Sequence, residues 1–132
     1  VQPADLHATL RHWFGQEGFS ESDPAGPDLC RPQSLLRLVE REDAPWRDRL
    51  LLFGPGGQQA IRVPAWYLRT RGEQAELFAK PDDRWDVNEV ADRCPEALDR
   101  LREVLGGSIS ALADERAANW PPLDDLLRSG LQ

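Results

Sequence analysis

The stretch QQAIRVPAWYLRTRGEQAELFA, residues 58–79, decides the fold of this chain. It holds three short runs rich in apolar, aromatic and β-branched residues, at 58–63, 66–70 and 75–79, which are separated by turn-forming proline or glycine. A fourth apolar run, RLLLF at 49–53, comes just before them. The connections are short, whereas a parallel crossover needs about a dozen residues or more, so we predict an antiparallel meander.

The segment GPGG at 54–57 is rich in glycine, which also occurs in phosphate-binding loops. Such loops need the N-terminus of a following helix to hold the phosphate, and here a strand follows instead. We therefore interpret GPGG as a hairpin turn.

Helical periodicity appears on both sides of these strands. Residues 3–15 place Leu6, Leu10, Trp13 and Phe14 on one face, and the segment 16–32 that follows is rich in proline and glycine and reads as a linker. Further helices are expected at 33–40, at 95–105 with an end at Gly106 and Gly107, more weakly at 108–119, and as a turn or two in the tail 120–132. The predicted fold class is α+β, a small antiparallel sheet of three to four strands flanked by helices.

Composition excludes several classes of function. The 132 residues carry 16 Lys and Arg against 23 Asp and Glu, for a net charge of -7, so a nucleic-acid partner is not expected. No apolar run reaches the roughly 20 residues needed to span a bilayer, and residues 1–10 lack the pattern of a signal peptide. We expect a soluble chain without a membrane partner, and the sequence does not reveal its location.

The cysteines and histidines form no recognisable site. Cys30 and Cys94 are far apart and lack a CxxC pair, which favours ordinary thiols and leaves a long-range disulfide or a reactive thiol as alternatives. His7 and His12 are five residues apart, so they do not share the helix face that a metal pair requires. A small hydrolase using either histidine with Asp5 is disfavoured, because no nucleophile at a sharp turn accompanies them.

The segment PDDRWDVNEV, residues 81–90, contains enough oxygen donors to suggest a calcium loop. It lacks the central glycine and the closing glutamate of an EF-hand, so we expect no metal site in this chain. A structural turn explains the segment better. Pro81 ends the strand, and Asp82 and Asp83 suit a turn. Asp86 then caps a helical turn in capping-box fashion with Glu89, and Val87 and Val90 face inward.

Four segments, taken in order, resemble one family. VQPADLHATL (1–10) is similar to a "QPxDLxPTLL" helix, RPQSLLRL (31–38) to "GRSLLPLL", AIRVPAWYLR (60–69) to "AIRTPRWKYI", and residues 76–92 to "ELYDLxxDPxExxNLA". This series resembles the C-terminal region of a type I sulfatase, of the arylsulfatase branch of the alkaline phosphatase superfamily. The resemblance implies that residues 1–32 belong to the end of the large α/β domain and residues 33–132 form the C-terminal α+β subdomain.

The resemblance also implies what this chain lacks. In the family the formylglycine, the calcium ligands and the Lys and His that handle the sulfate lie upstream, so we expect no catalytic residue here and a missing N-terminal catalytic domain as partner. Formylglycine and calcium are implied for the parent enzyme only. Cys30 begins a Cys-x-Pro stretch like the formylglycine signature, but Ser34 stands where that signature requires arginine.

We therefore expect a non-catalytic C-terminal subdomain of a sulfatase-like hydrolase that completes the fold and borders the substrate cleft. Arg62, Trp66 and Arg69 are the candidates for the cleft, because guanidinium groups suit sulfate or carboxylate and an indole suits a sugar or aryl face. The alternative for these residues is that they simply occupy the outer and inner faces of the sheet. The alternative for the chain is a free-standing protein-interaction module without enzymatic activity.

Overall fold

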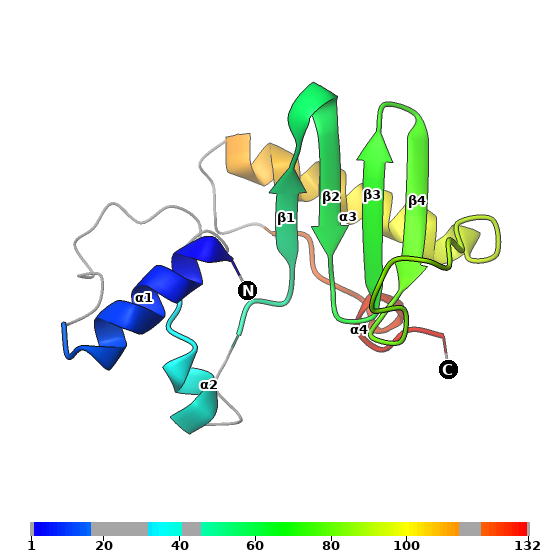
Figure 1. The fold of residues 1–132 in the computed structure, drawn as a ribbon. Coiled ribbons are helices and arrows are strands. Elements are labelled where there is room, and N and C mark those ends of the chain that lie inside the picture. The colour runs from blue at the N-terminus through cyan, green and yellow to red at the C-terminus, as the bar shows by residue number, and fades with distance from the viewer. Residues whose placement is uncertain (1, 17–31, 41–45, 114–119, 132) are drawn as a thin grey trace. The chain divides into compact units, whose positions relative to one another are not determined.

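The computed structural model describes residues 2–16, 32–40, 46–113 and 120–131. The chain divides into two compact units, Val1–Arg47 and Asp48–Gln132, which we describe separately (Figure 1). The linker expected at 16–32 falls almost entirely outside the described residues, as does Cys30, whereas Cys94 is a half-buried free thiol. The domain boundary expected between residues 32 and 33 refers to a whole sulfatase and stays a prediction.

The second unit is built on a four-stranded antiparallel sheet, which confirms the predicted fold class. Its strands run in the order β1-β2-β3-β4, so each strand pairs with its neighbour in sequence. The strands are β1 (Leu50–Phe53), β2 (Gln58–Arg62), β3 (Trp66–Arg71) and β4 (Gln74–Ala79). The turn between β1 and β2 holds Gly56 and Gly57 at positive φ, a conformation that glycine adopts without strain.

One face of the sheet forms the core. The register places four apolar residues side by side across all four strands: Leu51, Ile61, Leu68 and Leu77. Helix α3 (Pro95–Ala113) lies along this face, and its Ala97, Leu101, Val104 and Leu105 belong to the same buried cluster (Figure 1). The cluster is therefore a single layer between sheet and helix, as expected for an amphipathic helix on a half-buried sheet.

The C-terminal residues complete this core. The expected helical turn is α4 (Asp125–Ser129), whose N-cap Asp124 accepts a hydrogen bond from Leu127 N at 2.9 Å. Leu123 and Leu127 are buried in the cluster. The segment is thus part of the packed core rather than a loose tail.

Helix α3 corrects the expected stop at Gly106 and Gly107. The helix continues through both glycines to Ala113, and Ser108 and Ala111 are buried on it. A Cβ on Gly107 would lie 2.6 Å from Pro121 Cγ, so the glycine lets another segment approach the helix. The local stop signal is overridden by a tertiary contact.

The segment between β4 and α3 also differs from expectation. Residues 86–89 form no helical turn, and Asp86 has a positive φ of 56°, so the expected capping box is wrong. The expected turn at Asp83 is present, and the Asp83 carboxylate accepts hydrogen bonds from Val87 N and Asn88 N. Val87 points outward, with 74% of its surface exposed.

The first unit contains α1 (Pro3–Trp13) and the short α2 (Leu36–Glu40). The expected helix with Pro3 in its first turn is confirmed. Asp5 follows in that same turn and is fully buried, although it is charged. Its burial is explained by the groups that surround its carboxylate.

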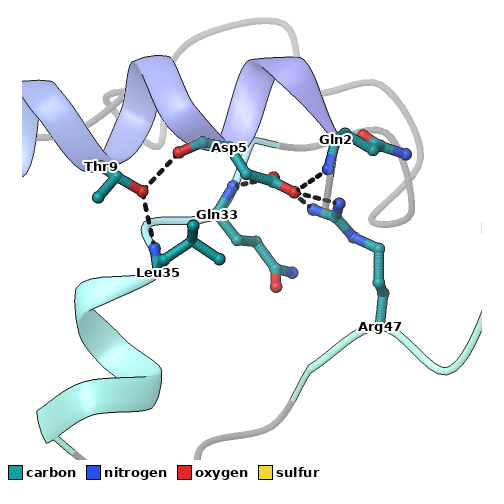
Figure 2. A network of polar contacts seen from close by, with 6 residues as sticks. All are labelled: Gln2, Asp5, Thr9, Gln33, Leu35 and Arg47. Carbon is teal, nitrogen blue, oxygen red and sulfur yellow. Dashed lines mark hydrogen bonds and ion pairs between the residues drawn. The ribbon is translucent and has the colours of Figure 1, made fainter.

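The Asp5 carboxylate collects donors from three segments of the first unit (Figure 2). It accepts Gln2 N at 2.6 Å, Gln33 N at 2.9 Å, and both Nη atoms of Arg47 at 2.8 and 2.9 Å. Thr9 adds a further link, because its Oγ1 donates to Asp5 O and accepts from Leu35 N. The bidentate pair with Arg47 and the two backbone donors together compensate the burial of this carboxylate and join the three segments.

The apolar face of α1 does not contribute to a core. Three large apolar side chains on α1, with that of the C-cap residue Phe14, are between 55% and 74% exposed: Leu6, Leu10, Trp13 and Phe14. These are the residues that the helical periodicity of residues 3–15 places on one face.

Candidate functional site

Two of the three candidate residues lie together on the sheet face that α3 leaves uncovered. Side chains alternate along a strand, so Arg62, paired with Tyr67, and Arg69, paired with Glu76, face away from the row of Ile61 and Leu68. This face therefore carries two guanidinium groups, the side chains that suit an oxyanion, near the rings of Tyr67 and Phe78.

Arg69 is already committed to partners within the sheet. Its Nε donates to Glu76 Oε2 at 2.7 Å, and its guanidinium lies 5.7 Å from the centre of the Phe78 ring. The hydrogen bond to Glu76 is the main reason why the pKa of Arg69 is raised. Its charge is therefore balanced before any ligand arrives.

Arg62 is different. It is half-buried, and within the part of the chain that the structure describes no hydrogen bond or close ion pair holds its guanidinium. Burial lowers the pKa of Arg62, and the negative charge of Asp86 and the neighbouring Tyr67 only partly oppose this. A bound oxyanion would therefore stabilise the charge of Arg62 more than that of Arg69, which already has a carboxylate partner.

Trp66, the third candidate, is placed in the core. Only 2% of its surface is exposed, and its indole Nε1 donates to Leu126 O at 2.9 Å. It therefore lies on the opposite face from the two arginines, and a substrate ring cannot reach its indole in this arrangement. Of the three candidates, only Arg62 lies on the open face with no carboxylate of the described residues bonded to its guanidinium, since Arg69 is paired with Glu76.

The acidic segment after β4 does not fit a metal ion. Lys80 Nζ contacts both the Asp86 carboxylate and Asp83 O, so one carboxylate is paired with a cation. The hydrogen bond from Val87 N, with a second from Asn88 N, holds the pKa of Asp83 below its usual value. Among the described residues, no group of three or more His, Cys, Asp or Glu could hold a metal ion.

One contact in the first unit was not visible from the sequence. His12 Nδ1 lies 2.9 Å from Ser34 Oγ, a pairing that a nucleophile and its base would also make. The pair is exposed, Ser34 Oγ also accepts Leu36 N at the start of α2, and Asp5 is engaged by Arg47 instead of orienting the histidine. The serine therefore acts as a helix cap rather than as part of a triad.

The comparison with solved structures agrees with this architecture. A structure from Bacteroides thetaiotaomicron, described as a sulfatase from a core genetic locus for the metabolism of multiple glycosaminoglycans, matches 80% of this chain with a TM-score of 0.54 and 20% identity. The chain has the fold of part of a sulfatase. It spans 24% of the length of that protein, and at this identity the likeness concerns the fold alone.

Other comparisons gave no match. No family model matches the sequence, and no curated protein does. Within the described residues, none of the helices has both the length and the apolar character that crossing a membrane requires.

Proposed function

We propose that this chain is the C-terminal α+β subdomain of a sulfatase-like hydrolase, in which it completes the fold and borders the substrate cleft. The fold likeness to a sulfatase supports the proposal, as does the small share of that protein which the chain spans. On this proposal the reaction is the hydrolysis of a sulfuric ester, and the catalytic residues belong to a preceding domain.

The observation that carries the proposal is that the described residues of the first unit contribute nothing to a buried hydrophobic core. The fully buried residue among them is the charged Asp5. A helix as short as α1 is marginal in water unless an apolar face is packed against something. Its exposed Leu6, Leu10, Trp13 and Phe14 therefore need a cover, and the large catalytic domain would supply it.

The open face of the sheet supplies the second role. In the parent enzyme, a hydrated formylglycine would attack the sulfate ester while calcium balances charge, and on this proposal both groups belong to the preceding domain. Arg62 would instead hold an oxyanion of the substrate outside the reacting centre, since no carboxylate among the described residues lies within hydrogen-bonding distance of its guanidinium. Its contribution would be to binding rather than to the chemical step.

The decisive experiment begins with the coding sequence upstream of Val1. The proposal expects Cys or Ser, any residue, Pro, any residue, Arg, with acidic metal ligands around this signature. The long polypeptide should then hydrolyse a sulfate ester from a panel of aryl sulfates and sulfated glycosaminoglycans, the latter suggested by the description of the matched structure. Absence of the signature would favour the alternative, a protein-interaction module whose partner must be sought by binding.

The role of Arg62 has its own test in the long polypeptide. Arg62→Gln should raise KM about tenfold or more with kcat nearly unchanged, because it removes binding that is equal in the ground and transition states. Arg71→Gln is the matched control, since Arg71 is exposed at the end of β3 and should leave both constants unaltered. Equal effects of the two substitutions would show that Arg62 does not bind substrate, while leaving the rest of the proposal intact.

A further inference from the structure

The two edge strands of the sheet, β1 and β4, differ in whether their outward backbone groups are hydrogen-bonded. Along the outer edge of β4, Leu77 N donates to Glu89 Oε1 at 3.0 Å and Leu77 O accepts Val90 N at 2.8 Å. Phe78 also forms an isolated bridge with Glu89. The segment after β4 thus closes this edge, which is a usual protection against pairing with another chain.

The outer edge of β1 has no such cover within the second unit. Gly54 N donates to Gln58 O, and hydrogen-bonded pairs alternate along an antiparallel ladder, so Leu50 and Leu52 direct their backbone groups toward β2. Leu51 and Phe53 therefore direct theirs outward. Among the described residues, no hydrogen bond to either of these outward groups is found.

The side chains along this edge favour association. Leu52 is 49% exposed and Phe53 is 59% exposed, and β1 contains no lysine, proline or bulge of the kind that protects natural edges. The chain is also free of charge from Leu50 through Ile61, in a protein whose net charge is -7. A second copy that approached this edge would meet no charged side chain over these residues, so repulsion between like charges would not oppose pairing there.

We propose that β1 pairs with β1 of a second copy of this chain, which joins the two sheets into one continuous antiparallel sheet. A two-fold axis through Leu52 places Leu51 of each copy opposite Phe53 of the other, so the outward N–H and C=O groups satisfy one another. The strand is short, so the dimer is weak and its population depends on concentration. This inference rests on the sheet alone and stands or falls independently of the catalytic domain.

The test measures the mass of the purified 132-residue chain by sedimentation across micromolar to millimolar concentrations. Phe53→Lys places a charge on the edge, and Phe53→Pro removes an outward N–H without touching the ladder to β2. Both should weaken dimerisation by about tenfold or more, which corresponds to about 1.4 kcal/mol. Leu10→Lys is the control, because it disrupts association through the exposed face of α1 instead.

Amide hydrogen exchange on the unmodified chain gives an answer that does not depend on the variants folding. The amides of Leu51 and Phe53 should become protected as concentration rises, while exposed amides elsewhere stay unchanged. A chain that remains monomeric over the whole range would overturn the proposal. So would a dimer that Leu10→Lys abolishes and Phe53→Lys leaves intact.

Discussion

Gly107 lies so close to Pro121 that a Cβ at position 107 would come within 2.6 Å of Pro121 Cγ, whereas a Cβ at Gly106 would meet nothing within 4 Å. Both glycines lie inside α3. Two adjacent positions in one helix therefore differ in a single respect, which is the space around the missing side chain.

The substitutions Gly106→Ala and Gly107→Ala should change stability in opposite directions. Gly106→Ala should raise the free energy of unfolding by up to about 1 kcal/mol, because alanine is the better helix former. Gly107→Ala should lower it by about 1 to 3 kcal/mol through overpacking against Pro121. Urea unfolding of the two variants measures both free energies. Equal changes would show that Pro121 does not restrict a side chain at position 107.

The sheet was predictable because its signals are local, and α3 was not fully predictable because its signal is not. Alternating apolar residues and short turns define β2 to β4, and strand parity sets Arg62 apart from Ile61. The contact of Gly107 with Pro121 joins segments that sequence periodicity cannot relate. The same holds for Asp5, whose position in a first turn is visible in the sequence, whereas its pairing with Arg47 is not.

Removal of the Asp5 carboxylate should loosen the first unit. Asp5→Ala leaves the Arg47 guanidinium buried without its carboxylate, a change that costs about 3 to 5 kcal/mol in comparable buried pairs. The amide of Gln33 should then exchange much faster by NMR. Thr9→Val is the control, since it releases the Leu35 amide but leaves that of Gln33 bonded to Asp5.

The same carboxylate predicts a dependence on pH. Burial opposes ionisation of Asp5, but hydrogen bonds from Arg47, Gln2 and Gln33 outweigh it and lower its pKa. A lowered folded pKa means that the stabilisation is complete above the unfolded value of about 3.9 and is lost as pH falls through the folded pKa. The Gln33 amide shift should therefore titrate with a midpoint below about 3.9. A midpoint above that value would contradict the arrangement.

Glu89 should control the closed edge of β4. Its Oε1 accepts Leu77 N and Ala91 N, and these two bonds lower the pKa of Glu89. Glu89→Ala should accelerate exchange of the Leu77 amide, while Glu89→Gln keeps an acceptor oxygen and should resemble the unmodified chain. The bond should persist as pH falls to about 4.3 and weaken only below it, because the folded pKa is the lower one.

The isolated chain should be more stable without Arg62. The guanidinium is half-buried between Leu50 and Tyr67 in the sheet register, and no described group forms a hydrogen bond with it. Arg62→Leu should raise the free energy of unfolding by roughly 0.5 to 2 kcal/mol, as often happens when a functional residue is replaced. Arg69→Leu should instead lower it by up to about 1 kcal/mol, because it removes the exposed pair with Glu76. A loss of stability in both variants would argue that Arg62 is structural.

The C-terminal segment is an integral part of the core. It contributes two buried leucines and the acceptor of the Trp66 indole. Trp66 Nε1 has its acceptor at Leu126 O, and Leu123 and Leu127 fill the cluster beneath the sheet. A chain cut before Leu123 would keep every strand and α3, yet it would leave a tryptophan with an unsatisfied donor facing a water-filled gap. Trimming this protein from its C-terminal side should therefore cost its cooperativity of folding before it removes any regular secondary structure other than α4.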